Sequence, residues 1–249
     1  MSSNTTTPPK HQWVSTEDGS RTLFSEAFQE ACHSTAGARE ETLLHYINGC
    51  QIEAKIDTQA SLSILEVGFG LGIGFLTTFE VLKDITKPWK FLSLEIDGEL
   101  LEWFRLENLS HPFLRHLHWD GNLLKANNDQ INLTIVCGDA RVELPRYLLS
   151  NPESWDCIYQ DAFSPKKNPT LWSVQWFKLL KAHSAPTVIV STYSASTSIR
   201  KSLLQAGWTL QKGEKFGPKR TSTRASLQGV SDPEILLHLE RSPALAITD

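Results

Sequence analysis

The pattern of apolar and polar residues changes at about residue 60. From residue 61 onward, short apolar runs alternate with stretches of helical spacing, which is typical of a parallel sheet with crossover helices. The apolar runs predict strands at residues 61–67, 90–95, 132–137, 155–160 and 187–193. The helical stretches predict helices at residues 73–83, 98–108, 140–150, 169–182 and 195–206. We therefore predict an α/β fold.

The remaining segments are less regular. Residues 13–58 are interpreted as an N-terminal cap, with a short β element near 13–24 and a helix near 36–47 that ends at Asn48-Gly49. Polar residues 109–130 predict a surface excursion, and residues 208–239 predict antiparallel edge strands. The domain plan is a disordered tail at 1–12, the cap at 13–58, one domain at 59–240 and a tail at 241–249.

A glycine-rich turn follows the strand at 61–67. Glycine occupies every second position at Gly68, Gly70 and Gly72, and Glu66 stands two residues ahead. Such a turn lets backbone N–H groups approach a small ligand closely. A carboxylate beside it would repel a pyrophosphate but suits the amine and sulfonium of S-adenosylmethionine. We predict that these four residues bind this methyl donor.

Two other readings of the turn remain open. A dinucleotide site requires glycine at the sixth position of G-x-G-x-x-G, where this chain has Ile73 or Phe75, depending on the first glycine. The turn could also be a structural strand-to-helix connection without a ligand.

Carboxylates stand at the ends of four predicted strands: Glu66, Glu95, Asp139 and Asp161. Ligands of open α/β sheets bind beyond the carboxyl ends of the strands. Glu95 can accept hydrogen bonds from both ribose hydroxyls of the donor, and Asp139, followed by Ala140, can accept one from the adenine amine. For each of these carboxylates, the alternative role is capping of the next helix. For Asp139, capping and ligand binding are equally favoured.

The segment Asp161-Ala-Phe-Ser-Pro165 occupies the place where amino-methylating enzymes keep an Asp/Asn-Pro-Pro-aromatic loop. An amine nucleophile must be unprotonated, and Asp161 can orient the ammonium form and remove its proton. Phe163 can stack on a flat ring. Lys166 and Lys167 can contact phosphates, although they also suit a solvated loop.

Charge is distributed unevenly along the chain. The net charge is −4, but residues 162–231 hold 11 lysines and arginines and a single acidic residue, a net +10. This block predicts a polyanion partner on one face, or else a basic surface without a ligand.

Composition excludes several classes of protein. No apolar run reaches the roughly 18 residues of a membrane helix, and residues 1–10 lack the apolar core of a signal peptide. The four cysteines form no C-x-x-C pair, so we expect no metal, and buried reduced thiols at Cys137 and Cys157. We expect a cytoplasmic protein without a membrane partner.

Longer motifs resemble one family. The run Asp161–Pro169 followed by Leu171-Trp172 closely resembles the signature of the MnmC-type tRNA methyltransferase domain. Further matches extend the resemblance over nearly residues 15–222 and include Asp18-Gly-Ser20, Thr22–Ser25, Phe28, His33-Ser34, Gly37-Ala38, Glu41, Leu65–Gly70, Gly138–Ala140, Thr192–Ser194, Arg200, Ala206-Gly207 and Phe216–Arg220.

The resemblance implies a Rossmann-like class I methyltransferase fold, with a mostly parallel seven-stranded sheet and an antiparallel edge. It implies methyl transfer from S-adenosylmethionine to the primary amine of 5-aminomethyl-(2-thio)uridine at the tRNA wobble position, with Asp161 at the reacting amine. It also implies that tRNA contacts His33, Ser34, Lys219 and Arg220.

Many members of the family carry a fused flavin-dependent oxidase, which this sequence lacks. We therefore expect the stand-alone form, without FAD and with upstream wobble-uridine modification enzymes as candidate partners. Cys32 and Ala162 depart from the usual pattern, which affects substrate preference. Two other functions remain open: a small-molecule amine methyltransferase or aminopropyltransferase, and an inactive module that binds cofactor or RNA.

Overall fold

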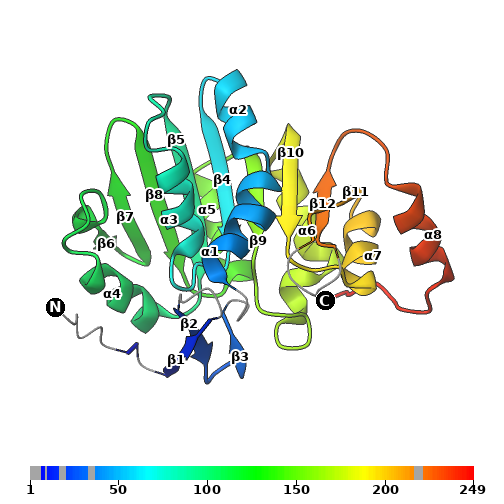
Figure 1. Cartoon of the computed structure of the whole chain (residues 1–249), viewed down its shortest axis with the longest axis horizontal. Coiled ribbons are helices and arrows are strands. Elements are labelled where there is room, and N and C mark those ends of the chain that lie inside the picture. Colours follow the sequence, from blue (N-terminus) through cyan, green and yellow to red (C-terminus); the bar gives the residue numbers. More distant parts are fainter. Residues whose placement is uncertain (1–6, 9, 17–20, 33–36, 216–220) are drawn as a thin grey trace.

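The computed structural model describes residues 7–8, 10–16, 21–32, 37–215 and 221–249. In this part of the chain, a mixed sheet has nine strands in the order β11-β12-β10-β9-β4-β5-β8-β7-β6 (Figure 1). Its strands are β4 (Leu62–Val67), β5 (Trp89–Glu95), β6 (His118–Asp120), β7 (Leu123–Asn127), β8 (Ile131–Cys137), β9 (Trp155–Gln160), β10 (Ser184–Thr192), β11 (Thr209–Lys212) and β12 (Thr223–Ser226).

Helices cover both faces of this sheet (Figure 1). They are α1 (Ala38–Thr42), η1 (Leu43–Asn48), α2 (Ile52–Thr58), α3 (Ile73–Val81), α4 (Gly98–Glu107), η2 (Leu114–His116), α5 (Ala140–Ser150), η3 (Pro169–Trp172), α6 (Val174–Ala182), α7 (Thr197–Gln205) and α8 (Pro233–Arg241). The predicted α/β fold is confirmed. The five central strands, β8, β5, β4, β9 and β10, are parallel.

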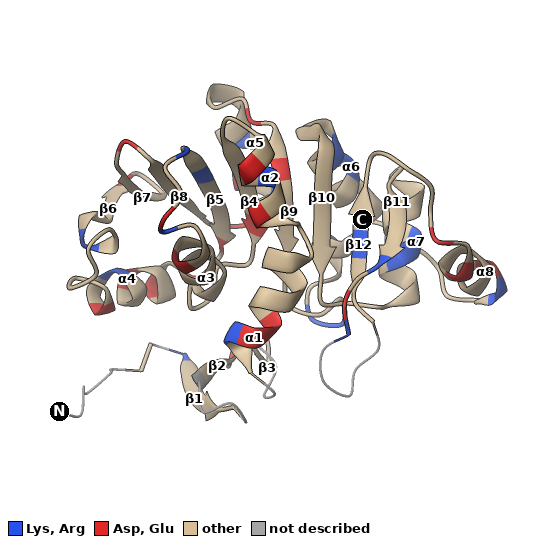
Figure 2. Cartoon of the chain, turned by 45° about the horizontal axis from the view of Figure 1, so that its top comes forward, with Lys and Arg blue, Asp and Glu red and all other residues tan. Residues whose placement is uncertain are grey.

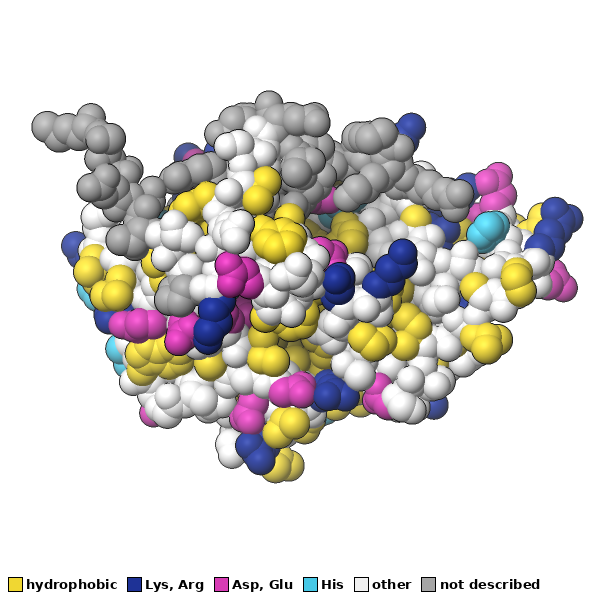
Figure 3. Space-filling view, turned by 90° about the horizontal axis from the view of Figure 1, so that it is seen from below, with side chains coloured by type: hydrophobic (Ala, Val, Ile, Leu, Met, Phe, Trp, Pro, Cys, Tyr) yellow, Lys and Arg dark blue, Asp and Glu magenta, His cyan; other side chains and the backbone are white. Residues whose placement is uncertain are grey.

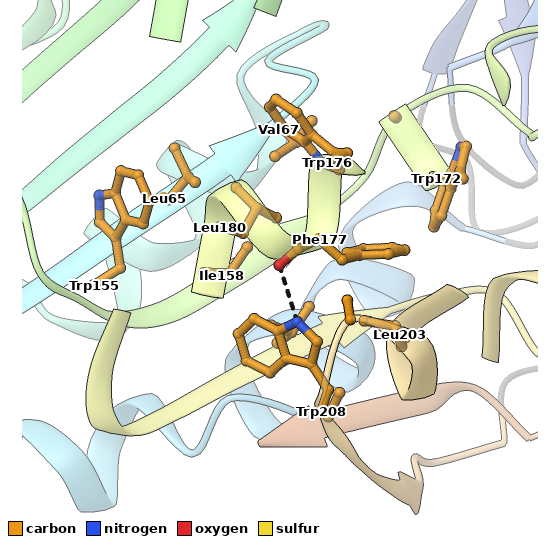
Figure 4. Packing of buried hydrophobic residues seen from close by; sticks show 14 of the residues in the cluster. Leu65, Val67, Trp155, Ile158, Trp172, Trp176, Phe177, Leu180, Leu203 and Trp208 are labelled. Carbon is orange, nitrogen blue, oxygen red and sulfur yellow. Dashed lines mark hydrogen bonds between the residues drawn. The ribbon is translucent and has the colours of Figure 1, made fainter. Parts of the chain in front are cut away.

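Alternation along the central strands builds two cores. Leu65 and Val67 of β4 face the helices α5, α6 and α7, whereas Leu62 and Ile64 face η1, α2 and α3. Both sets are almost fully buried, which explains the near-continuous apolar runs of these strands. Figure 4 shows the first core, where Trp155, Trp172 and Trp208 pack together with Trp176 and Phe177 of α6.

The sheet is larger than the predicted seven strands. Residues 118–127, expected to be a surface excursion, form the hairpin β6–β7, which pairs antiparallel with β8. Leu124 and Ala126 are buried, but this alternation covers only two positions and Leu123 directly precedes Leu124, so it was not apparent in the sequence. The other edge has the predicted antiparallel strands, β11 and β12.

The secondary structure predicted for three segments differs from the structure. The segment that follows Asn168 is not one helix, because η3 ends at Trp172 and Ser173 caps α6 by accepting from the N–H of Trp176. Residues 233–241 form α8, where Asp232 caps the helix and Ile235 and Leu239 are buried one turn apart. The helix α2 follows Gly49, where only a helix end was expected.

The N-terminal part contains a separate antiparallel sheet, β1 (His11–Ser15), β2 (Arg21–Ser25) and β3 (Glu30–Ala31). It lies beyond the carboxyl ends of the central strands (Figure 1). Leu23 docks it against Leu71 and Leu100. β1 begins at His11, inside the range predicted as a disordered tail.

The last residues are also held by the domain. The N–H of Val174 donates to the carbonyl of Ile247 at 2.9 Å, and the N–H of Ile247 donates to Ser202 Oγ at 2.8 Å. The segment predicted as a tail at 241–249 therefore packs onto α6 and α7. In the described ranges, no helix combines the length and the apolar character needed to cross a membrane.

We predict that Trp208→Phe destabilises the protein by roughly 1–3 kcal/mol, because it removes a buried hydrogen bond and leaves a small cavity. Trp208 is 1% exposed and its Nε1 donates to the Phe177 carbonyl at 3.1 Å (Figure 4). Trp119→Phe is the matched control, since Trp119 is 37% exposed and donates to Glu102 at the surface. Urea unfolding measures both variants, and equal losses of stability would contradict the prediction.

Candidate active site

The order of the sheet creates a switch point between β4 and β9. From β4 the chain proceeds through β5 to β8, then crosses back to β9 and continues through β10 in the other direction. Crevices at such points are the usual ligand sites of open α/β sheets. A pocket lies here, beyond the carboxyl ends of the strands, and apolar side chains line a hollow on this face in Figure 3.

Two loops meet at the switch point. The N–H of Asp161, after β9, donates to the carbonyl of Val67 at 3.0 Å. A Cβ at Gly68 would lie 2.7 Å from the carbonyl oxygen of Asp161, and Gly68 has a φ of +99°. Glycine is therefore required at this position for steric and conformational reasons.

The turn after β4 forms one wall of the pocket. Gly70 has a φ of +53°, and a Cβ built on it would meet no atom within 4 Å. Its N–H donates to Glu95 Oε2 at 2.9 Å, and the N–H of Asp97 donates to Oε1 at 2.9 Å. Glu95 lines the pocket, and burial raises its pKa while these amides oppose the rise.

Three predicted donor-binding residues do not line the pocket. Glu66 is 2% exposed, and its Oε2 accepts from Ser93 Oγ at 2.7 Å behind the glycine turn. Gly72 is the N-cap of α3 and faces Phe69 and Phe104. Asp139 caps α5 and pairs with Arg141, so the structure shows the capping role that the sequence had left open. Ala140, by contrast, lines the pocket.

Asp161 lies on the opposite wall. Tyr46 of η1 donates its hydroxyl proton to Asp161 Oδ1 at 2.5 Å. Burial raises the pKa of Asp161 well above its usual value, the hydroxyl of Tyr46 opposes this rise, and Glu41 adds to it. A carboxyl group with a raised pKa in a pocket is a candidate general base.

The residues that follow Asp161 are fixed one by one. Tyr193 donates to the carbonyl of Ala162 at 3.0 Å, and Trp172 Nε1 donates to that of Phe163 at 2.8 Å. Ser164 Oγ donates to Glu30 at 2.8 Å. The loop therefore presents Asp161 and Phe163 on a rigid support.

The small N-terminal sheet closes the pocket from outside. Phe28 stacks on Phe163, with ring centroids 4.5 Å apart and an interplanar angle of 19°. Both rings line the pocket, as do Glu30 and Cys32 of the same sheet region and Glu41 of α1. The cavity is therefore shared between the sheet at 62–226 and the N-terminal segment.

Comparison with known proteins agrees with this geometry. Residues 107–228 match a family described as S-adenosyl-L-methionine-dependent methyltransferase. The bifunctional protein MnmC of tRNA 5-methylaminomethyl-2-thiouridine biosynthesis from Aromatoleum aromaticum is 30% identical over 223 residues, which are 84% of this chain and 34% of that protein. The crystal structure of MNMC2 from Aquifex aeolicus superposes with a TM-score of 0.76 at 28% identity, covering 96% of this chain and 79% of the other.

The chain belongs to the MnmC-type methyltransferase family. It spans about a third of the length of the bifunctional relatives. An uncharacterized protein from Methanocaldococcus jannaschii is 26% identical over 223 residues, 87% of this chain and 59% of that protein. The fold and the family together show that this MnmC-type domain is an S-adenosylmethionine-dependent methyltransferase.

The basic residues lie outside the pocket of the MnmC-type domain. Lys166 and Lys167 are exposed on the turn after the Asp161 loop. Figure 2 shows further lysines and arginines on α6, α7 and β12. His33, Ser34, Lys219 and Arg220 lie outside the described residues. None of the described residues that line the pocket is a lysine, arginine or histidine, whereas Glu30, Glu41, Glu95 and Asp161 line it, so the cavity is acidic.

Sequence reasoning missed Tyr46 and Tyr193 as site residues. Phe28, Glu41 and Tyr193 belonged to the motifs that resemble the family, and this could have identified them as site residues. Tyr46 was in no quoted motif, because its contact with Asp161 spans 115 positions. Cys137, expected to be buried, is half-exposed beside the pocket, whereas Cys157 is buried as expected.

We predict that Asp161→Asn stabilises the folded MnmC-type domain at neutral pH but much less near pH 4. The raised pKa means that the folded state keeps its proton where the unfolded state, with an ordinary pKa near 3.9, has lost it. Wild-type stability therefore falls as pH rises through this range, whereas asparagine does not titrate. Urea unfolding of both proteins at several pH values tests this, and a difference independent of pH would contradict it.

Proposed function

We propose that this chain is a tRNA-modifying N-methyltransferase that methylates the amine of 5-aminomethyl-(2-thio)uridine at the wobble position. The observation that carries the proposal is the position of Asp161, a half-buried carboxylate that shares one pocket with the glycine turn and Glu95. Relatives named for tRNA 5-methylaminomethyl-2-thiouridine biosynthesis support the choice of substrate.

The residues present are suited to S-adenosylmethionine. The open space at Gly70 allows a ligand to approach the backbone. Gly68 and Ala140, which also line the pocket, have no side chain or only a methyl group and so leave room for the ligand. Each oxygen of Glu95 accepts one amide hydrogen and retains a lone pair for a ribose hydroxyl. Glu66, Gly72 and Asp139 act from behind this wall by supporting the turn and the helix starts.

Bound S-adenosylmethionine supplies a methyl group activated on a sulfonium. The side chains on the opposite wall prepare the acceptor. Asp161 holds the ammonium form of the acceptor amine and takes its proton, which leaves a nitrogen lone pair for the displacement. Its raised pKa brings the proton affinity of the Asp161 carboxylate closer to that of the acceptor amine.

Aromatic and basic residues would position the rest of the substrate. Phe163, in the pocket, offers a stacking surface for a uracil ring. Lys166 and Lys167 stand where they can contact phosphates beside the wobble nucleotide, and Lys219, Arg220, His33 and Ser34 are proposed to contact tRNA as well. The acidic cavity admits a cationic amine, and the basic surroundings attract the polyanion that carries it.

The decisive experiment supplies labelled S-adenosylmethionine and tRNA from cells that lack this gene. Mass spectrometry of the wobble nucleosides should show conversion of the aminomethyl to the methylaminomethyl form. Methylation of a polyamine with no transfer to tRNA would favour a small-molecule enzyme. Binding of tRNA and donor without turnover would favour an inactive module.

We predict that Asp161→Asn lowers methyl transfer at least 100-fold, in line with the usual contribution of a general base, while the Kd for S-adenosylmethionine stays within several-fold. Glu95→Gln should weaken donor binding by about 1–3 kcal/mol, because a hydrogen bond to a charged group is lost. Calorimetry and initial rates separate the two effects. Loss of donor binding in Asp161→Asn would remove Asp161 from the proposed role.

We predict that Lys166→Glu/Lys167→Glu weakens tRNA binding at least 10-fold and reduces the dependence of log K on log salt, because phosphate contacts release counterions. Lys83→Glu/Lys90→Glu is the control. It changes charge equally at two exposed lysines near the amino ends of the strands. Filter binding at several salt concentrations measures both variants, and equal affinity for tRNA would place the RNA surface elsewhere.

A further inference from the structure

The element that carries Tyr46 has an uncommon conformation. η1 is a π-helix of six residues between α1 and Gly49, and π-turns occur often at functional sites. One contact fixes it to the central sheet, because Ser191 Oγ of β10 donates to the carbonyl of His45. The helix that follows, α2, is fixed to the same strand, because Lys55 Nζ donates to the carbonyl of Thr187 at 2.6 Å. Contacts with β10 therefore hold η1 and the start of α2.

The ring of Tyr46 is held as firmly as its backbone. It is 2% exposed and stacks on Tyr159, with ring centroids 5.2 Å apart and an interplanar angle of 28°. The hydroxyl of Tyr159 lies 3.1 Å from Thr78 Oγ1 and shares a hydrogen bond with it. Burial raises the pKa of Tyr46 well above its usual value, so the hydroxyl keeps its proton and donates to Asp161.

The other titratable groups around Asp161 do not favour its charge. They are Glu41 of α1, Glu30 of β3, Cys32 after β3, Glu66 of β4, Glu95 of β5 and Tyr193 after β10. All are neutral or anionic. One histidine, His45, faces Glu41, with its Nε2 4.0 Å from Glu41 Oε1. Glu41 is 8% exposed and lines the same pocket. Tyr46 thus contributes the hydrogen bond that stabilises the ionised form of Asp161, and Glu41 opposes it.

We propose that Tyr46 is a positioning residue for methyl transfer, which holds the Asp161 carboxylate in one orientation and keeps it ionised against the opposing field of Glu41. The proposal rests on the proposed function for its kinetic meaning. Tyr46, on this π-helix, is the residue of the N-terminal segment that donates to the carboxylate after β9. Tyr46 and Glu41 together set the pH range in which Asp161 can accept a proton.

The test compares pH profiles of kcat/KM for methyl transfer to tRNA. In Tyr46→Phe, the acidic limb should move upward by about one pH unit, the scale for one hydrogen bond to a carboxylate. In Glu41→Gln, it should move downward, because a neighbouring negative charge is removed. Opposite shifts are not expected from a loss of packing, since both side chains keep nearly the same shape.

Tyr193→Phe is the matched control. Tyr193 also donates a phenolic hydrogen bond to the loop, but its acceptor is the carbonyl of Ala162 rather than the carboxylate. Its acidic limb should stay at the wild-type position even if the rate falls. The proposal would be overturned if the acidic limb of the kcat/KM profile lay at the same pH in Tyr46→Phe, in Tyr193→Phe and in the wild type.

A second measurement does not depend on turnover. Carbon-13 NMR titration of aspartate carboxyls, with Asp161→Asn used to assign the Asp161 signal, should show a higher pKa in Tyr46→Phe and a lower one in Glu41→Gln. Unchanged titration in both variants would overturn the proposal whether or not the protein methylates tRNA. Shifted titration in a protein that does not methylate tRNA would support the role of Tyr46 and reject the proposed function.

Discussion

The site depends on the close approach of two loops at the centre of the sheet. The turn after β4 and the loop after β9 come into backbone contact at Gly68 and Asp161. A side chain at position 68 would force them apart. In the function proposed above, the turn binds the methyl donor and Asp161 the acceptor amine, so this contact would determine how near the two reactants can come. Methyl transfer is an in-line displacement that relies mainly on positioning, so the distance between the loops controls the chemistry.

Around this contact the protein maintains an electrostatic contrast. Carboxylates gather in the pocket, where burial raises the pKa of Glu95 and Asp161. In the C-terminal half, Lys166, Lys167, Lys178, Lys212 and Lys215 are exposed, whereas Arg200 is buried. A polyanion would be attracted to the outside, whereas the cavity itself would accept a cationic group. Such a contrast can separate the recognition of a nucleic acid from the recognition of the atom to be modified.

The N-terminal segment completes the site rather than merely covering it. Phe28 and Glu30 contact the Asp161 loop directly, through a ring stack and a hydrogen bond to Ser164. Tyr46 reaches the same carboxylate from η1. Tyr46 and Ile47 of η1 also belong to one of the two cores that pack on the parallel sheet. The cap is therefore part of the catalytic architecture.

The sequence alone determined the alternation of strands and helices, the glycine turn and the acidic residues at the strand ends, because these depend on local periodicity and on backbone freedom at particular residues. It also carried the motif around Asp161. Only the tertiary structure decided that Glu95 and Asp161 face the pocket while Glu66 and Asp139 do not, since the direction of a side chain at a strand end depends on what packs beside it. The hairpin β6–β7 and the Tyr46–Asp161 contact were likewise decided by packing between segments far apart in the chain, which local patterns do not encode.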